Sequence, residues 1–478
     1  MVRRLGLVLA VLMMLAIALP ALAADVKIKG DFNNRFMVYT NHNDWLAMED
    51  AGLDDGDVNE TWGEAKYRLW FDATTNDGKV KGLWAFEVGA LHYGDESKGA
   101  GGYSGDGMVF ETRWLYTDFQ LPWACNKARV RMGLQPFTVN GYYWQETVMG
   151  VTADFAAGPV DIKVGWLRPW EDASYGEDED ESDMDAFYAR VNFKPADGIK
   201  AGIFGVWHTG DSDLDNGAGG TITSQHYELK KLENKFDTSI VTFGTDGKAN
   251  FGNFFVNWDL MYQTGSIDEA QFVQVYKFDS KLGSQFQDLS DPAGALNDDF
   301  DLSAYFAHFD IGMKLDALKF TYTFWYSSGD DDPYDSDFDG FMAVDLDRAD
   351  NICIFEGGFT DDNYFTEKPY ILDKGFIMNK LAVDYKASKK LSLGSSVMYM
   401  MTAEDVEYYA LDGTLEKEDE VGFEVDAYLK YKLYDNVEFA VNAGYLFSGD
   451  ALDAFEVERD GSSDEDVFIS TMRVRYKF

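Results

Sequence analysis

Basic residues recur at alternate positions of the sequence, a spacing that would align their charges. Residues two apart point to the same face of a β-strand, and this parity groups Lys66, Arg68, Arg113, Arg129, Arg131, Arg190, Arg473 and Arg475 on inward faces. Two interpretations are open. The side chains form a ladder of cations whose field attracts anions, or they are polar groups neutralised by Glu64, Glu87 and Glu111.

Carboxylates dominate two other segments, "EDASYGEDEDESDMD" (171–185) and "SSGDDDPYDSDFDG" (327–340). Asp335, Asp337 and Asp339 precede Gly340 with the spacing that opens a Ca²⁺-binding loop. The glutamate expected at the twelfth position is replaced by Leu346. These three aspartates are therefore candidate Ca²⁺ ligands, with solvated charge as the alternative. We expect no other cofactor.

Catalytic motifs are missing from the sequence. It contains no HExxH, GxSxG, P-loop or Cys/His cluster, and its five histidines are scattered. The formal net charge is −43, and no basic patch offsets it. These observations argue against an enzyme and against a nucleic-acid-binding protein.

The first residues have the pattern of a secretory signal peptide. Arg3 and Arg4 precede an apolar run over 5–19, and Ala21-Leu22-Ala23 supplies a small-x-small cleavage site. We expect residues 1–23 to be removed and residues 24–478 to form one domain. No later stretch has the roughly 18 apolar residues that a membrane-spanning helix requires.

Strand-like alternation of apolar and polar residues recurs along residues 24–478. The clearest segments are "TWGEAKYRLWFDA" (61–73), "ARVRMGLQ" (128–135) and "VGFEVDAYLKYK" (421–432). We predict 18 strands. The strands near 149–157 and 300–313 are the weakest predictions, and losing one hairpin would leave 16.

The predicted connections alternate in length. Eight are short turns, and nine are long, acidic and rich in glycine, near 41–60, 93–108, 137–149, 169–184, 210–235, 265–299, 329–375, 403–419 and 449–466. Short periplasmic turns that alternate with long external loops are typical of a transmembrane antiparallel β-barrel. Such a barrel must close, because every backbone polar group in the bilayer needs a partner.

The segment "FISTMRVRYKF" (468–478) is the predicted closing strand, paired with the strand near 26–40. Its parity directs Tyr476 and Phe478 toward lipid at the inner interface, where aromatic girdles lie. Arg473 and Arg475 then face the interior.

A final phenylalanine preceded by alternating apolar residues resembles the signal that the barrel-assembly machinery reads in bacterial outer-membrane proteins. With the starting segment "DVKIKGDFNNRF", the segment "ARVRMGLQPF" and the acidic loops, the sequence resembles the homotrimeric outer-membrane porins of sulfate-reducing bacteria. The resemblance implies a homotrimer in outer-membrane lipid. It also implies a water-filled channel for passive diffusion of small hydrophilic solutes and ions.

In porins the third external loop folds into the barrel and narrows it. The resemblance assigns this role to "FTVNGYYWQETVMG" (137–150), with Tyr142, Tyr143 and Trp144 at the constriction and Glu146 as its one carboxylate. Acidic outer loops favour cations and inner arginines favour anions, so selectivity stays open. The alternative function is a secreted or surface-attached all-β binding protein, stabilised by Ca²⁺ and soluble without detergent.

Two cysteines are present. Cys125 falls in a predicted short turn and Cys353 in a predicted external loop, at opposite ends of the barrel. A disulfide requires Cα atoms within about 7 Å, so both thiols are expected to be free.

Overall fold

The alternating segments of the sequence form one β-sheet in the computed structural model. It describes residues 24–41, 59–94, 110–122, 128–171, 183–210, 220–223, 229, 237–273, 297–332, 335–344, 348, 350–354, 374–410, 412–455, 462–463 and 466–478. The predicted signal peptide and Cys125 lie outside these residues. None of the described helices is long and apolar enough to cross a membrane.

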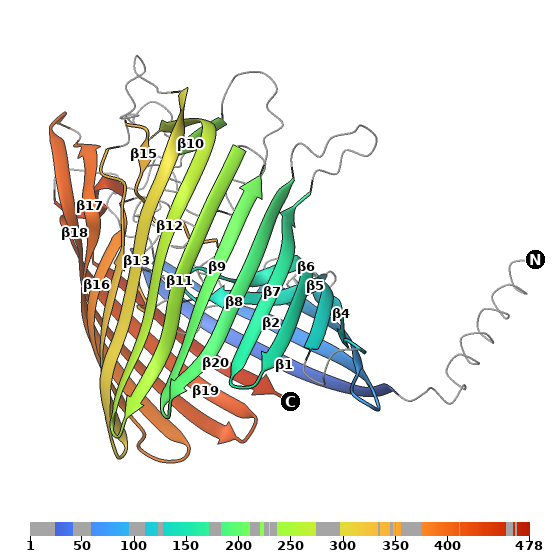
Figure 1. Ribbon diagram of the computed structural model, residues 1–478. Coiled ribbons are helices and arrows are strands. Elements are labelled where there is room, and N and C mark those ends of the chain that lie inside the picture. The colour runs from blue at the N-terminus through green and yellow to red at the C-terminus, as the bar shows by residue number, and fades with distance from the viewer. Residues whose placement is uncertain are drawn as a thin grey trace, which may run out of the picture.

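Eighteen of the twenty strands build the wall of a closed antiparallel barrel, and Figure 1 shows them inclined around a common interior. The wall strands are β1 (Ala24–Thr40), β2 (Asn59–Thr75), β3 (Val80–His92), β4 (Phe110–Gln120), β5 (Ala128–Asn140), β6 (Trp144–Ala157), β7 (Val160–Trp170), β8 (Met184–Ala196), β9 (Ile199–Gly210), β11 (Asp237–Phe251), β12 (Phe254–Val273), β13 (Asn297–Leu315), β14 (Leu318–Ser327), β16 (Phe376–Tyr385), β17 (Leu391–Tyr409), β18 (Leu415–Tyr434), β19 (Val437–Ser448) and β20 (Val467–Lys477). The predicted fold and strand number are confirmed, including the two weakest strands, β6 and β13.

Three short elements belong to the external connections. β10 (Gly220–Thr223) pairs in parallel with β12, and β15 (Asp337–Phe338) pairs in parallel with β13. A 3₁₀ helix, η3 (Asp450–Phe455), follows β19. These elements extend the barrel on its long-loop side without entering the wall.

β20 closes the barrel against β1, as the sequence predicted. Phe478 and Gly30 exchange two backbone hydrogen bonds of 3.0 and 3.1 Å. A Cβ atom at Gly30 would lie 2.2 Å from the Phe478 ring, so a larger residue there would displace the ring from its present position. The ring stacks on Tyr476, with centroids 5.3 Å apart, and contacts Phe32 edge-on.

Apolar side chains alternate outward around the wall. Met472, Val474 and Tyr476 are exposed on the outer face of β20, whereas Arg473 is buried inside. The same parity holds on β18, where Phe423 and Val425 face outward and Glu424 is fully buried. This apolar-out, polar-in pattern suits a wall with lipid outside and water or polar groups inside.

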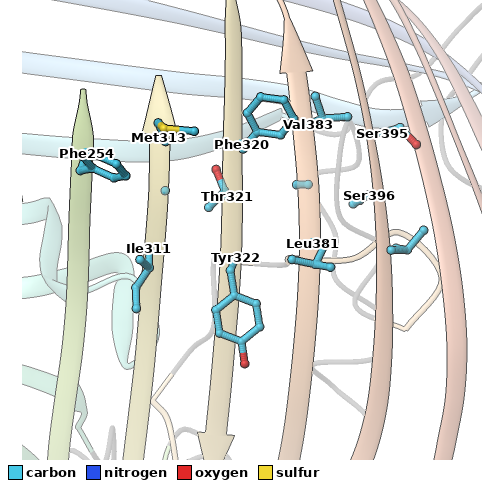
Figure 2. Close-up of a pocket in the computed structure, with 13 residues that line it drawn as sticks. Phe254, Ile311, Met313, Phe320, Thr321, Tyr322, Leu381, Val383, Ser395 and Ser396 are labelled. Atoms are coloured by element: carbon cyan, nitrogen blue, oxygen red, sulfur yellow. The ribbon is translucent and has the colours of Figure 1, made fainter. Parts of the chain in front are cut away.

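An apolar groove of about 530 Å³ crosses the outer face of β12 to β17 (Figure 2). Exposed Ile311, Phe320 and Leu381 line it, and Gly312 and Ala382 contribute to the same lining. The groove therefore opens toward the lipid side of the wall and is not a route through the interior.

Two of the predicted long loops are instead tight ends of hairpins. β5 and β6 are joined by residues 141–143, where a loop over 137–149 was predicted, and β17 and β18 by 410–414, where 403–419 was predicted. β17 and β18 continue through acidic residues because both faces of a hairpin beyond the bilayer can contact water. Polar residues there are compatible with strand structure.

Candidate functional site

The tip of the β5–β6 hairpin lies inside the barrel. Tyr142, Tyr143 and Trp144 are at most 2% exposed. The Tyr142 hydroxyl lies 2.8 Å from Nε2 of His308 on β13, and the Tyr143 hydroxyl lies 3.2 Å from Nδ1 of His208 on β9. The tip thus reaches strands that are far from β5 and β6 in the wall. Aromatic side chains with a polar end suit this position, because each fills space and still bonds across the interior.

Glu146 lies outside this buried tip. It is exposed on β6, opposite Phe137 in the hairpin register. The three aromatic residues of the predicted constriction are therefore buried inside the barrel, while the carboxylate of the same segment is exposed.

A second segment, the described residues between 339 and 354 of the β14–β16 connection, also folds inward. Gln263 on β12 forms two hydrogen bonds with the backbone of Met342. Its amide donates to the Met342 carbonyl and accepts from the Met342 N–H, both at 3.0 Å. Glu424 on β18 accepts the N–H groups of Ile352 and Cys353 at 2.7 and 2.9 Å. We call the described part of this segment, residues 339–344, 348 and 350–354, the inner loop.

The inner loop was missed from the sequence, although a signal for it exists. "GFMAV" (340–344) and "NICIF" (351–355) are apolar runs in an otherwise acidic connection. Cys353 at the centre of the second run is free, as predicted, and fully buried. Its environment is the barrel interior and not an exposed external loop.

The hairpin tip and the inner loop contact each other. The Val344 N–H donates to the Tyr143 carbonyl at 2.8 Å. The Arg348 guanidinium lies 5.2 Å from the centre of the Tyr142 ring, and the Tyr142 hydroxyl donates to Asp350 at 2.8 Å. The two segments therefore narrow the interior together.

A cavity of about 720 Å³ adjoins this constriction on the short-turn side. Charged residues dominate its wall: Asp161, Arg190, Asp246, Asp259, Asp310, Arg348, Lys194, Lys200 and Lys248. The cavity provides a polar space within the barrel directly beside the narrowed level.

Two opposed carboxylates, Asp246 and Asp259, lie at the boundary between the cavity and the constriction. They are register partners on β11 and β12, and like charges opposite each other destabilise a strand pair. The Asn140 amide donates to both, at 3.2 and 2.6 Å. Arg190 donates to Asp246 at 2.8 Å and to the Val139 carbonyl at 2.8 Å. These bonds offset the repulsion and fix the hairpin to the wall.

The predicted inward basic residues each lie beside a carboxylate. The pairs are Lys66, Arg68 and Arg113 with Glu87; Arg129 and Arg131 with Asp118; Arg190 with Asp246; Arg473 with Glu438; and Arg475 with Asp31. Of the predicted acidic partners, Glu64 pairs with Arg35, and exposed Glu111 is the register partner of Glu87. This geometry favours neutralised polar groups over a ladder of free cations.

Asp335, Asp337 and Asp339 lie together in the connection after β14. Asp335 accepts the Asp337 N–H at 2.8 Å, and burial together with neighbouring carboxylates raises the pKa of Asp335 and of Asp339. Among the described residues, no group of three His, Cys, Asp or Glu side chains is placed to hold a metal ion. Ca²⁺ binding here stays a prediction, which thermal unfolding with Ca²⁺ or EDTA tests.

Three solved structures share the architecture. They are the Pseudomonas aeruginosa proteins OccK8 (OprE), the outer membrane protein OpdK, and OccK9 (OpdG), each with a TM-score of 0.51. Their sequence identities are 11%, 9% and 10%, over 95% of this chain and 98% of theirs. At this identity the likeness shows the fold, an outer-membrane-type β-barrel. No family model and no curated protein matches the sequence.

Proposed function

We propose that this chain is a bacterial outer-membrane porin, a channel through which small hydrophilic solutes and ions diffuse passively. The observation that carries the proposal is a closed barrel with an apolar exterior and a charged interior cavity beside an inward hairpin. A barrel with this polarity is stable in a bilayer because lipid contacts the outward apolar residues and the strands satisfy the backbone.

The mechanism is geometric and electrostatic, and it needs no cofactor. Tyr142, Tyr143 and Trp144, together with the inner loop, set the width of the passage. Arg190, Asp246 and Asp259 at the cavity act on the charge of a passing solute.

The finer assignments rest on the sequence resemblance. Residues 1–23 would direct export, and Tyr476 and Phe478 would be read by the barrel-assembly machinery. The protein would form a homotrimer like the porins of sulfate-reducing bacteria. The firm packing of Phe478 on Gly30 at the closing seam agrees with a role in assembly.

Planar-bilayer recording of the detergent-purified protein tests the proposal. We expect stepwise conductance, with steps in groups of three for a trimer, and the reversal potential in a salt gradient gives the selectivity. A protein that stays soluble without detergent and never conducts would favour the secreted binding protein instead. That alternative expects apolar faces packed against each other, whereas Phe423, Met472 and Val474 are exposed.

A further inference from the structure

Three lysines gather at the short-turn end of the cavity. Lys194 on β8, Lys200 on β9 and Lys248 on β11 line it, and all three side chains are exposed to its space. We call the part of the cavity that these three lysines line the inner vestibule. Asp161 on β7 also lines the cavity, but within the described part of the chain no carboxylate forms an ion pair with any of the three lysines.

Two of these lysines face each other directly. Lys200 and Lys248 are register partners in the β9–β11 pair. Side chains directly opposite lie about 5 Å apart at Cβ, and like charges there destabilise the pair. Lys314 and Lys319 repeat the arrangement on β13 and β14, with both ammonium groups over the Phe255 ring at 5.3 and 5.2 Å.

The two lysine pairs differ in their neighbours, because Lys319 lies 3.7 Å from the carboxylate of Asp384 whereas Lys200 and Lys248 form no ion pair among the described residues. Arg190, Arg131 and Arg473 each have a carboxylate partner. Among the described residues, Lys200 and Lys248 have no such partner, so positive charge is in excess between them. An anion between Lys200 and Lys248 would supply that charge. Ammonium groups act as compact point charges on flexible stems, which suits anions of varied shape.

We infer that the inner vestibule binds small oxyanions that carry two or more negative charges, such as inorganic phosphate or a dicarboxylate. The inference rests on the proposed channel function, because the cavity must be open to solution. The carboxylates Asp246, Asp259 and Asp310 line the constriction side of the same cavity. They repel anions that arrive from the long-loop side, so the site fills more readily from the short-turn side.

Block of single-channel current by a divalent anion tests the inference. Channels in potassium chloride at pH 8 receive potassium phosphate on one side and then on the other, and potassium succinate in parallel. We expect a dose-dependent fall in current at lower concentrations from the short-turn side. Lys389→Cys carrying biotin, in a Cys125→Ala background, marks that side by its reaction with streptavidin.

The matched variants separate the vestibule from general surface charge. Lys200→Gln with Lys248→Gln should raise the concentration that halves the current about tenfold or more. Lys389→Gln with Lys390→Gln removes the same charge from the exposed β16–β17 turn and should keep the wild-type block.

The outcomes separate the anion site from the channel itself. A conducting channel that neither phosphate nor succinate blocks, or whose block survives in Lys200→Gln/Lys248→Gln, overturns the anion site and leaves the porin proposal standing. A protein that never conducts overturns the porin proposal itself. Block by succinate alone assigns the site to carboxylates, and block by both assigns it to divalent oxyanions in general.

Discussion

The Tyr142 hydroxyl oxygen lies 2.8 Å from Nε2 of His308, which joins the tip of the β5–β6 hairpin to β13 across the barrel. The two rings pack with centroids 4.3 Å apart, and Trp325 meets the Tyr142 ring edge-on at 5.0 Å. Nδ1 of His308 lies 3.1 Å from Asp259 on β12. Tyr142 therefore connects the hairpin tip to β13 and, through His308, to β12. The Tyr142–His308 contact sets how far the hairpin reaches across the interior.

Tyr142→Phe should loosen the constriction. The substitution keeps the ring and removes one bonding partner from His308 and from Asp350, a loss of roughly 1–3 kcal/mol for a buried polar group. We expect higher conductance and more current noise in planar bilayers. Tyr93→Phe is the matched control, since it removes a hydroxyl that bonds Asn34 on the exposed outer face. Equal recordings for wild type and Tyr142→Phe would contradict the assignment.

Glu424→Ala should release the inner loop. One carboxyl oxygen accepts two buried N–H groups, and leaving a buried donor without its partner costs about 1–3 kcal/mol. Buried Cys353 then becomes accessible, so a maleimide that cannot cross membranes should react at least tenfold faster. The comparison uses a Cys125→Ala background, with Glu438→Ala, which pairs with Arg473 on the neighbouring strands, as the control. Unchanged labelling would show that other contacts hold the loop.

Gly444→Cys should form a disulfide with Cys353. A Cβ atom at Gly444 would lie 3.0 Å from the Cys353 sulfur. The same atom would lie 2.8 Å from Asp426 and from Ile352, so these side chains must shift slightly. We expect loss of free thiol on oxidation and a mean conductance equal to that of the reduced variant. A current abolished by oxidation and restored by a reductant would show instead that passage requires the loop to move.

The sequence predicted most of the wall and only part of the interior. The alternation of apolar and polar residues shows which face of each strand contacts lipid. It is clearest over 61–73, 128–135 and 421–432, and it repeats around the closed sheet. It also placed Tyr142 and its neighbours inside through the resemblance. Loop length failed as a guide, because β17 and β18 remain paired beyond the bilayer through acidic residues.

The contacts that shape the constriction depend on pairs remote in the chain. Glu424 alternates correctly as an inward residue, yet nothing local indicates that it accepts bonds from Ile352 and Cys353. The inward arginines were likewise grouped by parity, whereas their partners depend on the assembled strands. Arg131 pairs with its register partner Asp118, but Arg473 pairs with Glu438, whose register partner is Arg475. Local alternation shows which face of the wall a side chain is on. Its bonding partner is determined only when the barrel is assembled.

The base of the β14–β16 connection should respond to pH through Asp330. Its side chain is 2% exposed, and burial, with a contribution from Asp335 and Asp339, raises the pKa of Asp330 from 3.8 to about 7. The folded loop therefore prefers the protonated acid. Its stability is fully present below pH 4 and falls as the pH rises from 4 through 7.

Asp330→Asn should remove this pH dependence and protect the loop at pH 8. Hydrogen exchange of residues 328–344 at pH 5 and pH 8, corrected for intrinsic exchange, measures it. Wild type should lose protection at pH 8 and Asp330→Asn should not. Asp337→Asn, at an exposed position of the same connection, should behave as wild type. Equal slopes in wild type and Asp330→Asn would rule out Asp330 as the titrating group.

Single-channel conductance of wild type, compared with a variant in which a glycine–serine linker replaces residues 339–354, tests whether the inner loop narrows the channel. Both proteins should fold, shown by different gel mobility before and after heating, and both should conduct, with a larger conductance for the variant. Equal conductance would place the narrowest level away from the inner loop. A folded wild-type protein that never conducts would contradict the channel itself.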